Sequence, residues 1–382
     1  MIILNQKRML DTFLQLVQID SESGNEKQMQ DLIVRLLQEI GVRVYVDHAG
    51  KVAATNAQGN VIGFLPGTYK SSPFVLVSHL DTVSPGKNIF PVVKKDCVTS
   101  DGTTILGGDD KAGIALILEI LRTLQEQKLP HPPIEVIFTL SEECGMTGSK
   151  NLAYAKIKGR EGLVLDNEEL CDLLVQGPAA DTLEVWVKGL SAHAGVCPEK
   201  GISAVEVAAY ALSQMKLGRV DKDTVTNFAV VQGGKAINVV TDAVYLKADA
   251  RSLKEEKLEK QLAHIRACFD KAVKKYTKKI DGKICKPSVK MKVSKRYSSV
   301  HVPKNHPIVK AVLKAAQKQG ITMHAVASGG GCDGNVLSGH GFTLPNLGVG
   351  VRGCHTVHEK LVLKEFYAAF YIVLETILSY KK

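Results

Sequence analysis

The stretch FVLVSHLDTV, residues 74–83, decides the fold class. Its apolar first half predicts a buried strand, and polar residues follow where that strand ends. His79 and Asp81 lie two residues apart, so both side chains leave an extended chain on the same side. A carboxylate beside an imidazole holds the ring in the tautomer that a metal ion requires. The pair therefore suggests a metal ligand, although a His-x-Asp sequence at a strand end is more often structural than catalytic.

Two further apolar strands are followed by carboxylates in the same way. The strand predicted at 134–140 precedes Glu142 and Glu143. The strand predicted at 162–165 precedes Asp166. Open α/β sheets place their ligands at the carboxyl ends of strands, so all these side chains are expected at one site. Adjacent carboxylates repel each other unless a positive charge lies nearby, and with a metal one of the two glutamates would be a ligand and the other a general base.

Two other segments offer ligands, and each leaves a choice between neighbours. In LGGDDKAG, Asp109 and Asp110 come at the start of a predicted helix, where an aspartate is also a favoured N-cap. In GCHTVHEKL, His355 and His358 precede the last helix, and one of them is expected to complete the site. Imidazole and carboxylate ligands without a thiolate suit two divalent ions, zinc above all, with cobalt or manganese as alternatives.

The order of the predicted elements indicates two domains. Strands alternate with helices as far as Gly177, which predicts an α/β domain with a central parallel or mixed sheet. The following order of strand, helix, strand, strand, helix, strand is that of a split-βαβ module. Helices are predicted at 28–40, 112–127, 307–319 and 361–379, and a strand at 342–347. We therefore expect a catalytic domain of residues 1–176 and 297–382, interrupted by an inserted domain of residues 177–296.

Composition narrows the classes of partner. The 382 residues carry a net charge of +10, and residues 177–296 hold that whole excess, with 23 basic and 13 acidic residues. Only 5% of residues are aromatic, so the basic insert lacks interleaved rings and we expect no nucleic-acid partner. No apolar run approaches the ~20 residues of a membrane span. The absence of a signal-peptide pattern and the wide spacing of eight cysteines predict reduced thiols in the cytoplasm.

Five segments resemble, in order and spacing, the metal-site motifs of the peptidase T-like di-zinc metallopeptidases. They are SHLDTV, LGGDDKAG, LSEECGMTGS, VLD and GCHTVHEKL. The clan also contains carboxypeptidase G, aminoacylases and succinyl-diaminopimelate desuccinylase. The insert resembles its lid or dimerisation domain through GLSAHAGVCPEKGISA, GGKAINVVTDA and KADARS. The resemblance implies the zinc exopeptidase fold, which is a central mixed sheet flanked by helices, with a ferredoxin-like α+β insert that forms a homodimer.

The resemblance also implies a place for each ligand. The residues implied are His79 and Asp166 for one zinc ion, Glu143 and His355 for the other, and Asp109 as the bridge between them. Asp109 is preferred to its neighbour because it fills the Asp-x-Lys position before Lys111. His355 is preferred to His358 because it lies four residues before Glu359, as the family's ligand does before its glutamate.

Further residues are assigned by the resemblance to catalysis and substrate binding. Asp81 would orient the histidine two residues before it. Glu142 would act as general base on a water held between the two zinc ions. In the insert, His193 would reach across the homodimer to the substrate carbonyl, and Asn238 and Arg251 would help to bind the substrate's polar end.

The activity implied is that of an aminopeptidase on short peptides, similar to a tripeptidase. One position departs from the family's pattern, because tripeptidases of this type carry an arginine two residues before the equivalent of Gly331, where this chain has Gly329. Arginine is a natural bidentate partner for a terminal carboxylate. The alternative is therefore an N-acyl amino acid amidohydrolase or a dipeptidase with the same metal centre. A non-catalytic binding protein is disfavoured because both the ligands and the base are present.

Overall fold

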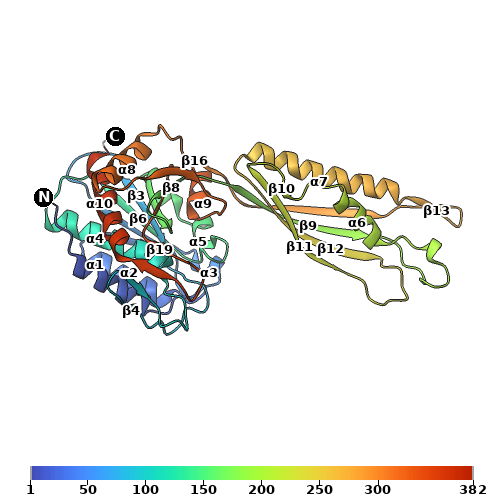
Figure 1. Ribbon diagram of the computed structural model, residues 1–382, viewed down its shortest axis with the longest axis horizontal. Coiled ribbons are helices and arrows are strands. Elements are labelled where there is room, and N and C mark those ends of the chain that lie inside the picture. The colour runs from blue at the N-terminus through green and yellow to red at the C-terminus, as the bar shows by residue number, and fades with distance from the viewer. Residues whose placement is uncertain (1, 381–382) are drawn as a thin grey trace. The chain divides into compact units, whose positions relative to one another are not determined.

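The computed structural model describes residues 2–380, which divide into two compact units (Figure 1). The first unit contains the chain up to Gly177 and from Val300 onward, and the second is Pro178–Ser299. Val300 pairs with Gly177 in the sheet of the first unit, which ties both residues to that unit. The second unit therefore begins one residue and ends three residues after the boundaries predicted from the sequence.

The first unit is built on a mixed sheet of nine strands. In spatial order the strands are β1 (Arg43–Val46), β2 (Val61–Leu65), β6 (Ile134–Thr139), β3 (Phe74–His79), β7 (Glu161–Asn167), β18 (Asn346–Gly348), β8 (Asp172–Gly177) and β16 (Val300–His301), with β17 (His324–Ala327) also paired to β8. β3 runs parallel to both β6 and β7, whereas β2 is antiparallel to β6 and β18 to β8. Parallel central strands are covered on both faces, which explains why β3 and β6 are mostly apolar and are buried throughout.

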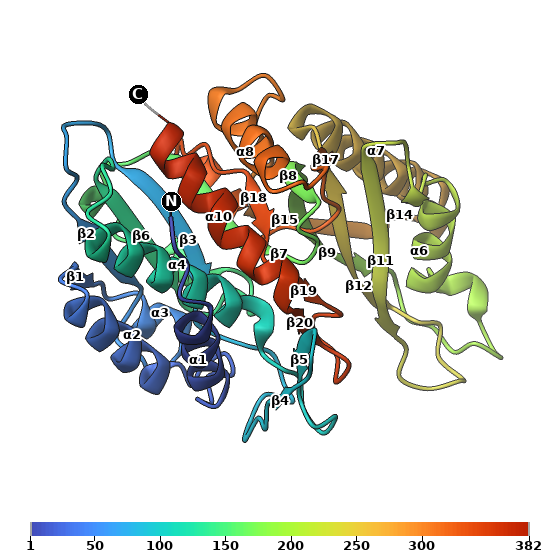
Figure 2. The ribbon, with the colours of Figure 1, turned by 60° about the vertical axis from the view of Figure 1, so that its left-hand side comes forward.

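Helices cover both faces of this sheet. Those on one face are α1 (Gln6–Val17), α2 (Lys27–Glu39), α4 (Gly108–Glu126), α8 (Pro307–Lys318) and α10 (Leu363–Ser379), which share one core and lie in front of the strands in Figure 2. α9 (Asp333–Gly339) packs into a separate core on the other face and contacts α5 (Thr147–Lys150), which in turn contacts α3 (Gly50–Ala53). The helices predicted at 28–40, 112–127, 307–319 and 361–379 are thus confirmed as α2, α4, α8 and α10.

The strand predicted at 342–347 is only partly regular, because β18 begins at Asn346 and the segment before it pairs with β7 through an isolated bridge at Thr343. Thr343 still exchanges backbone hydrogen bonds with residues 160 and 162, and the Pro345 carbonyl accepts one from Val164, but Pro345 has no N–H to give, so the strand ladder is interrupted there. Phe342 and Leu344 are buried because they fill the core under the sheet. Beside the main sheet, a small sheet joins β4 (Val92–Val93), β5 (Cys97–Thr99), β20 (Lys360–Val362) and β19 (Val351–Arg352).

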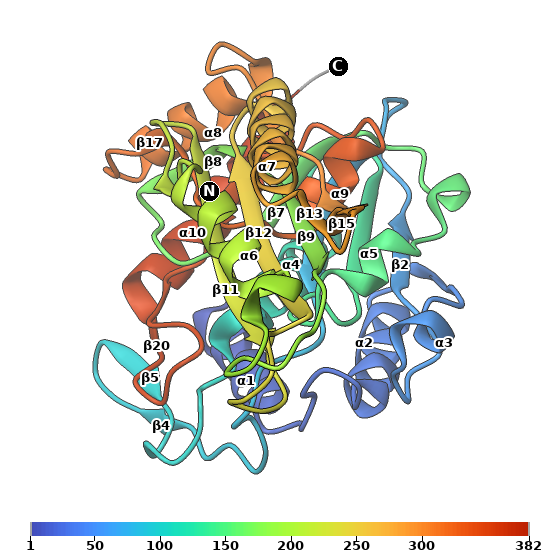
Figure 3. The same cartoon turned by 90° about the vertical axis from the view of Figure 1, so that its right-hand side faces the viewer.

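The second unit is an antiparallel sheet with two helices on one face (Figure 3). Its strands run in the order β10 (Gly218–Arg219), β11 (Thr224–Gly233), β12 (Ala243–Ser252), β9 (Ala179–Lys188) and β15 (Ser288–Tyr297), and its helices are α6 (Ala204–Ser213) and α7 (Glu255–Lys275). Apart from β10 and a hairpin of β13 (Lys278–Ile280) and β14 (Lys283–Cys285), this is the predicted ferredoxin-like order. Within residues 2–380, no helix has both the length and the apolar character that a bilayer span requires.

Candidate metal centre

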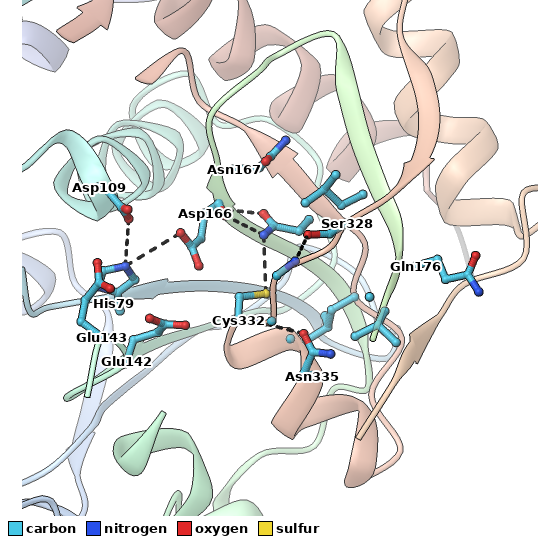
Figure 4. A pocket seen from close by; sticks show the side chains of 18 of the residues that line it. His79, Asp109, Glu142, Glu143, Asp166, Asn167, Gln176, Ser328, Cys332 and Asn335 are labelled. Carbon is cyan, nitrogen blue, oxygen red and sulfur yellow. Dashed lines mark hydrogen bonds and ion pairs between the residues drawn. The ribbon is translucent and has the colours of Figure 1, made fainter. Parts of the chain in front are cut away.

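The site forms where three neighbouring parallel strands end. His79 is the last residue of β3, and Asp166 is the last but one of β7. Glu142 and Glu143 follow just beyond the end of β6. Because β3 lies between β6 and β7, these side chains meet at one edge of the sheet. Asp109 enters from the start of α4, and Figure 4 shows it facing His79.

One carboxylate lies between two histidines. Oδ1 of Asp109 is 3.1 Å from Nε2 of His79, and Oδ2 is 3.3 Å from Nε2 of His355. Beyond them, Oδ1 of Asp166 is 3.8 Å from Nε2 of His79, and Oε1 of Glu143 is 2.7 Å from Nε2 of His355. Asp109 is therefore shared by two imidazole–carboxylate pairs, with a different oxygen facing each imidazole.

The donor atoms form overlapping sets. Ligand atoms lie within 4.8 Å of one another in the sets His79–Asp109–Asp166, His79–Glu142–Glu143 and Asp109–Glu143–His355. Neither Asp110 nor His358 belongs to any of these three sets. Asp110 instead turns towards β3. Its carboxylate accepts hydrogen bonds from the hydroxyl of Ser78 and from the backbone N–H of His79. Of each neighbouring pair in the sequence, the structure thus brings Asp109 and His355 to the cluster.

Asp81 supports the cluster with both its main chain and its side chain. Its carboxylate accepts hydrogen bonds from the backbone N–H groups of Glu142 at 2.9 Å and Glu143 at 3.2 Å, and from the Ser23 hydroxyl at 2.6 Å. Nδ1 of His79 lies 2.9 Å from the backbone carbonyl of Asp81 and 3.5 Å from its carboxylate. The carbonyl is thus the nearer partner of the imidazole, while the carboxylate fixes the loop that carries the two glutamates.

Two other buried carboxylates, which sequence reasoning did not place in the site, hold the loops around it. Glu359, 1% exposed, accepts three hydrogen bonds from backbone N–H groups of residues 106–109, at 2.8, 2.7 and 2.9 Å. Glu26 accepts one from the hydroxyl of Ser141 at 2.9 Å. Ser141 has a left-handed backbone, with φ of 48°, and immediately precedes the two glutamates. Both carboxylates are more than 100 positions away in the sequence from the groups that they bind. The sequence therefore gave no signal of these contacts.

Burial and neighbouring charges perturb the ionisable groups of the site. Burial raises the pKa of Glu142 and that of Asp166 well above their ordinary values, and nearby carboxylates raise both further. Hydrogen bonds to Asp109 and Glu143 raise the pKa of His355 to about 10. A divalent cation would favour ionised carboxylates and neutral imidazoles here. Carboxylate and imidazole donors without a thiolate fit zinc, cobalt or manganese, so the residues present suit the group that the resemblance implies.

A cavity of about 220 Å³ opens beside the donor sets (Figure 4). Its wall includes the apolar side chains of Leu174, Val300 and Leu344 and the uncharged polar side chains of Gln176, Ser328 and Asn346. Among the described residues, no lysine or arginine lines it. A Cβ atom built on Gly329 would have no heavy atom within 4 Å, so a larger side chain has room to start there.

The three insert residues singled out from the sequence lie towards two ends of one sheet. His193 and Asn238 lie on adjoining loops, because the N–H of residue 194 donates to the Asn238 carbonyl at 2.9 Å. The second of these loops leads into the start of β12, whereas Arg251 is next to its last residue, roughly 25 Å of strand further on. Nε of Arg251 lies 2.7 Å from Oδ2 of Asp249. The second unit thus brings His193 and Asn238 together and places Arg251 apart from them.

Comparison with known proteins identifies the family. The model of "Peptidase family M20/M25/M40" matches residues 75–379, which include every donor of the three sets. The chain belongs to this family. It is a peptidase T-like metallopeptidase that depends on divalent metal, and the resemblance seen in its five motifs is confirmed.

Similar proteins match over nearly the whole chain. The uncharacterized protein YqjE of Bacillus subtilis is 38% identical over 362 residues, which cover 94% of this chain and 95% of the relative. Among solved structures, the aminopeptidase PepT of Bacillus cereus is 37% identical with a TM-score of 0.91, and a tripeptidase of Staphylococcus aureus is 35% identical with a TM-score of 0.90. In both cases the match covers 98% of each chain, so the two-unit architecture is common to all three.

Proposed function

We propose that this metallopeptidase is a di-zinc aminopeptidase that acts on short peptides. The observation that carries the proposal is the position of Asp109 between His79 and His355, with a different carboxylate oxygen facing each imidazole. A carboxylate shared in this way suits two neighbouring divalent ions. The similarity to an aminopeptidase and to a tripeptidase supports short peptides as substrates.

In this proposal the donors divide between two zinc ions, with cobalt or manganese as substitutes. His79 and Asp166 would hold one ion, Glu143 and His355 the other, and Asp109 both. When bound, such ions polarise a carbonyl and lower the pKa of water. The chain's own contribution is to fix five donors from separate segments within a few ångströms of one another.

Glu142 is the general base in this proposal. Both glutamates line the cavity, but Oε1 of Glu143 lies 2.7 Å from Nε2 of His355, whereas burial raises the pKa of Glu142 well above its ordinary value. Asp81 holds the backbone of both glutamates, so the Glu142 carboxylate has a fixed position from which to act. It would take a proton from the attacking water and deliver that proton to the nitrogen of the leaving amine.

The substrate's terminal carboxylate has no cationic partner among the described residues that line the cavity. Gly329 stands where tripeptidases of this type carry an arginine, so strict selection of tripeptides is not expected. The same observation favours a second candidate, an N-acyl amino acid amidohydrolase or a dipeptidase that uses the same metal centre.

Metal analysis joined to a substrate panel tests the proposal. We expect two divalent ions per chain, loss of activity after chelation, and recovery with zinc, cobalt or manganese. Dipeptides, tripeptides and N-acyl amino acids should be compared with the same enzyme, and peptides with a free amino terminus should be cut fastest. Full activity after complete removal of metal would reject the metal centre, and a preference for acylated substrates would select the second candidate.

Replacing Gly329 with arginine is expected to increase selectivity for tripeptides. A bidentate contact to the terminal carboxylate should lower KM for tripeptides by about tenfold, which corresponds to about 1.4 kcal/mol. KM for the same peptides with an amidated C-terminus should not change, and Gly329→Ala should behave like the wild type. An equal effect on free and amidated peptides, measured by initial rates, would contradict the role assigned to this position.

We also propose that the second unit is a lid and dimerisation domain. His193 and Asn238 would serve the catalytic centre of a second copy, and their distance from Arg251 along β12 supports a division of substrate contacts between two copies. A protein that sediments as a monomer and keeps full peptidase activity would reject the proposed dimer.

We also propose the cytoplasm as the location, which is supported by the eight cysteines, all of them free.

A further inference from the structure

The main chain of Asp166 is held by a side chain from the neighbouring strand. Nδ2 of Asn346 donates to the carbonyl oxygen of Asp166 at 2.6 Å, and Oδ1 accepts from the N–H of Asp166 at 2.9 Å. The register between β18 and β7 shifts directly after Asn346. At this irregularity the amide of Asn346, 5% exposed, satisfies the two backbone groups of Asp166.

The same amide is itself part of the cavity wall and contacts a second residue that lines it. Nδ2 of Asn346 is 3.6 Å from Sγ of Cys332, the residue that precedes α9 (Figure 4). Cys332 is fixed in turn, because its N–H donates to Oδ1 of Asn335 at 3.0 Å. Asn346 therefore connects a metal donor to the rest of the wall against which a substrate would lie.

The carboxylate of Asp166 is not fixed by its histidine neighbour. It lies 3.8 Å from Nε2 of His79, which is longer than a hydrogen bond, so that contact does not fix it. We infer that Asn346 is a positioning residue that holds Asp166 ready for metal. An amide is required because it offers a donor and an acceptor together, whereas an ionised aspartate offers acceptors alone. This inference rests on the proposed metal centre.

The experiment compares Asn346→Ala and Asn346→Asp with the wild type, using the full chain and zinc as the probe. Zinc affinity is measured by competition with a chromophoric chelator, together with the unfolding temperature of the metal-free protein. We expect one of the two ions to bind about 10- to 100-fold more weakly in both variants, as for other groups that orient a metal ligand. Activity lost through weaker zinc binding should return when zinc is raised, because Glu142 and the metal donors themselves are unchanged.

The control is Thr376→Ala on α10, which removes another buried side chain whose hydroxyl donates to a backbone carbonyl at 2.7 Å. It should lower the unfolding temperature without changing zinc affinity. Wild-type affinity in the Asn346 variants, or an equal loss of affinity in the control, would overturn the inference while leaving the metal centre intact. Failure of the wild type to bind zinc would overturn both.

Discussion

Replacing Glu142 with glutamine is expected to lower kcat by about 100- to 10,000-fold, the usual contribution of a general base. Glutamine keeps the shape of the side chain but cannot take a proton from water. The backbone contacts to Asp81 involve N–H groups, so the substitution leaves them in place. Metal content should therefore stay at the wild-type value, and single-turnover kinetics should place the loss in the chemical step.

The matched control is Glu39→Gln at the exposed end of α2, which should leave kcat unchanged. A Glu142→Gln enzyme that hydrolyses peptides at the wild-type rate would show that another group carries the proton. Loss of a metal ion from the variant would instead make Glu142 a ligand, which its place in one donor set with His79 and Glu143 allows on geometry.

The elements that the sequence predicts well are those whose pattern follows from burial. β3 and β6 are buried on both faces, so they read as mostly apolar runs, interrupted in β6 by the buried Glu135. α2 shows helical spacing because one face alone packs on the sheet. α9 could not be found in this way. Three consecutive glycines and Cys332 precede it, and its own sequence begins Asp-Gly-Asn, which propensity assigns to a turn. It is helical because it fills the second core of the sheet.

For the site, the sequence predicts which residue types gather but not how each is held. The positions of His79, Glu142, Glu143 and Asp166 follow from one rule, that ligands collect where parallel strands end. The residue types alone left Asp109 and Asp110 open, and only the Asp-x-Lys position in the family motif favoured Asp109, because the choice depends on which way each side chain leaves the first turn of α4.

The residues that support the donors could not be predicted from the sequence, for a different reason. Asn346 contacts a residue 180 positions away, and its partner is a backbone group, which carries no sequence signal of its own. The same is true of Glu359, whose three partners are backbone N–H groups some 250 positions earlier. Contacts of this kind become visible only when the fold brings the two segments together.

Replacing Glu359 with alanine is expected to destabilise the first unit strongly. The change leaves three buried N–H groups of residues 106–109 without an acceptor, and each such group costs about 1–3 kcal/mol. We expect the free energy of unfolding to fall by roughly 3–5 kcal/mol and the unfolding temperature of the metal-free protein by about 10 °C. Calorimetry of the full chain measures both quantities.

The loop that Glu359 holds ends at Asp109, so the same variant should also lose metal. Asp109 is the carboxylate that both ions would share, and its own N–H is one of the three donors. Zinc affinity should therefore fall at both positions, unlike the loss at one position expected for the Asn346 variants. Glu359→Gln keeps an acceptor oxygen but turns an amide group towards the N–H donors, so an intermediate loss is expected. Glu39→Ala should change neither quantity, and a Glu359→Ala protein that unfolds and binds zinc like the wild type would contradict this account of the loop.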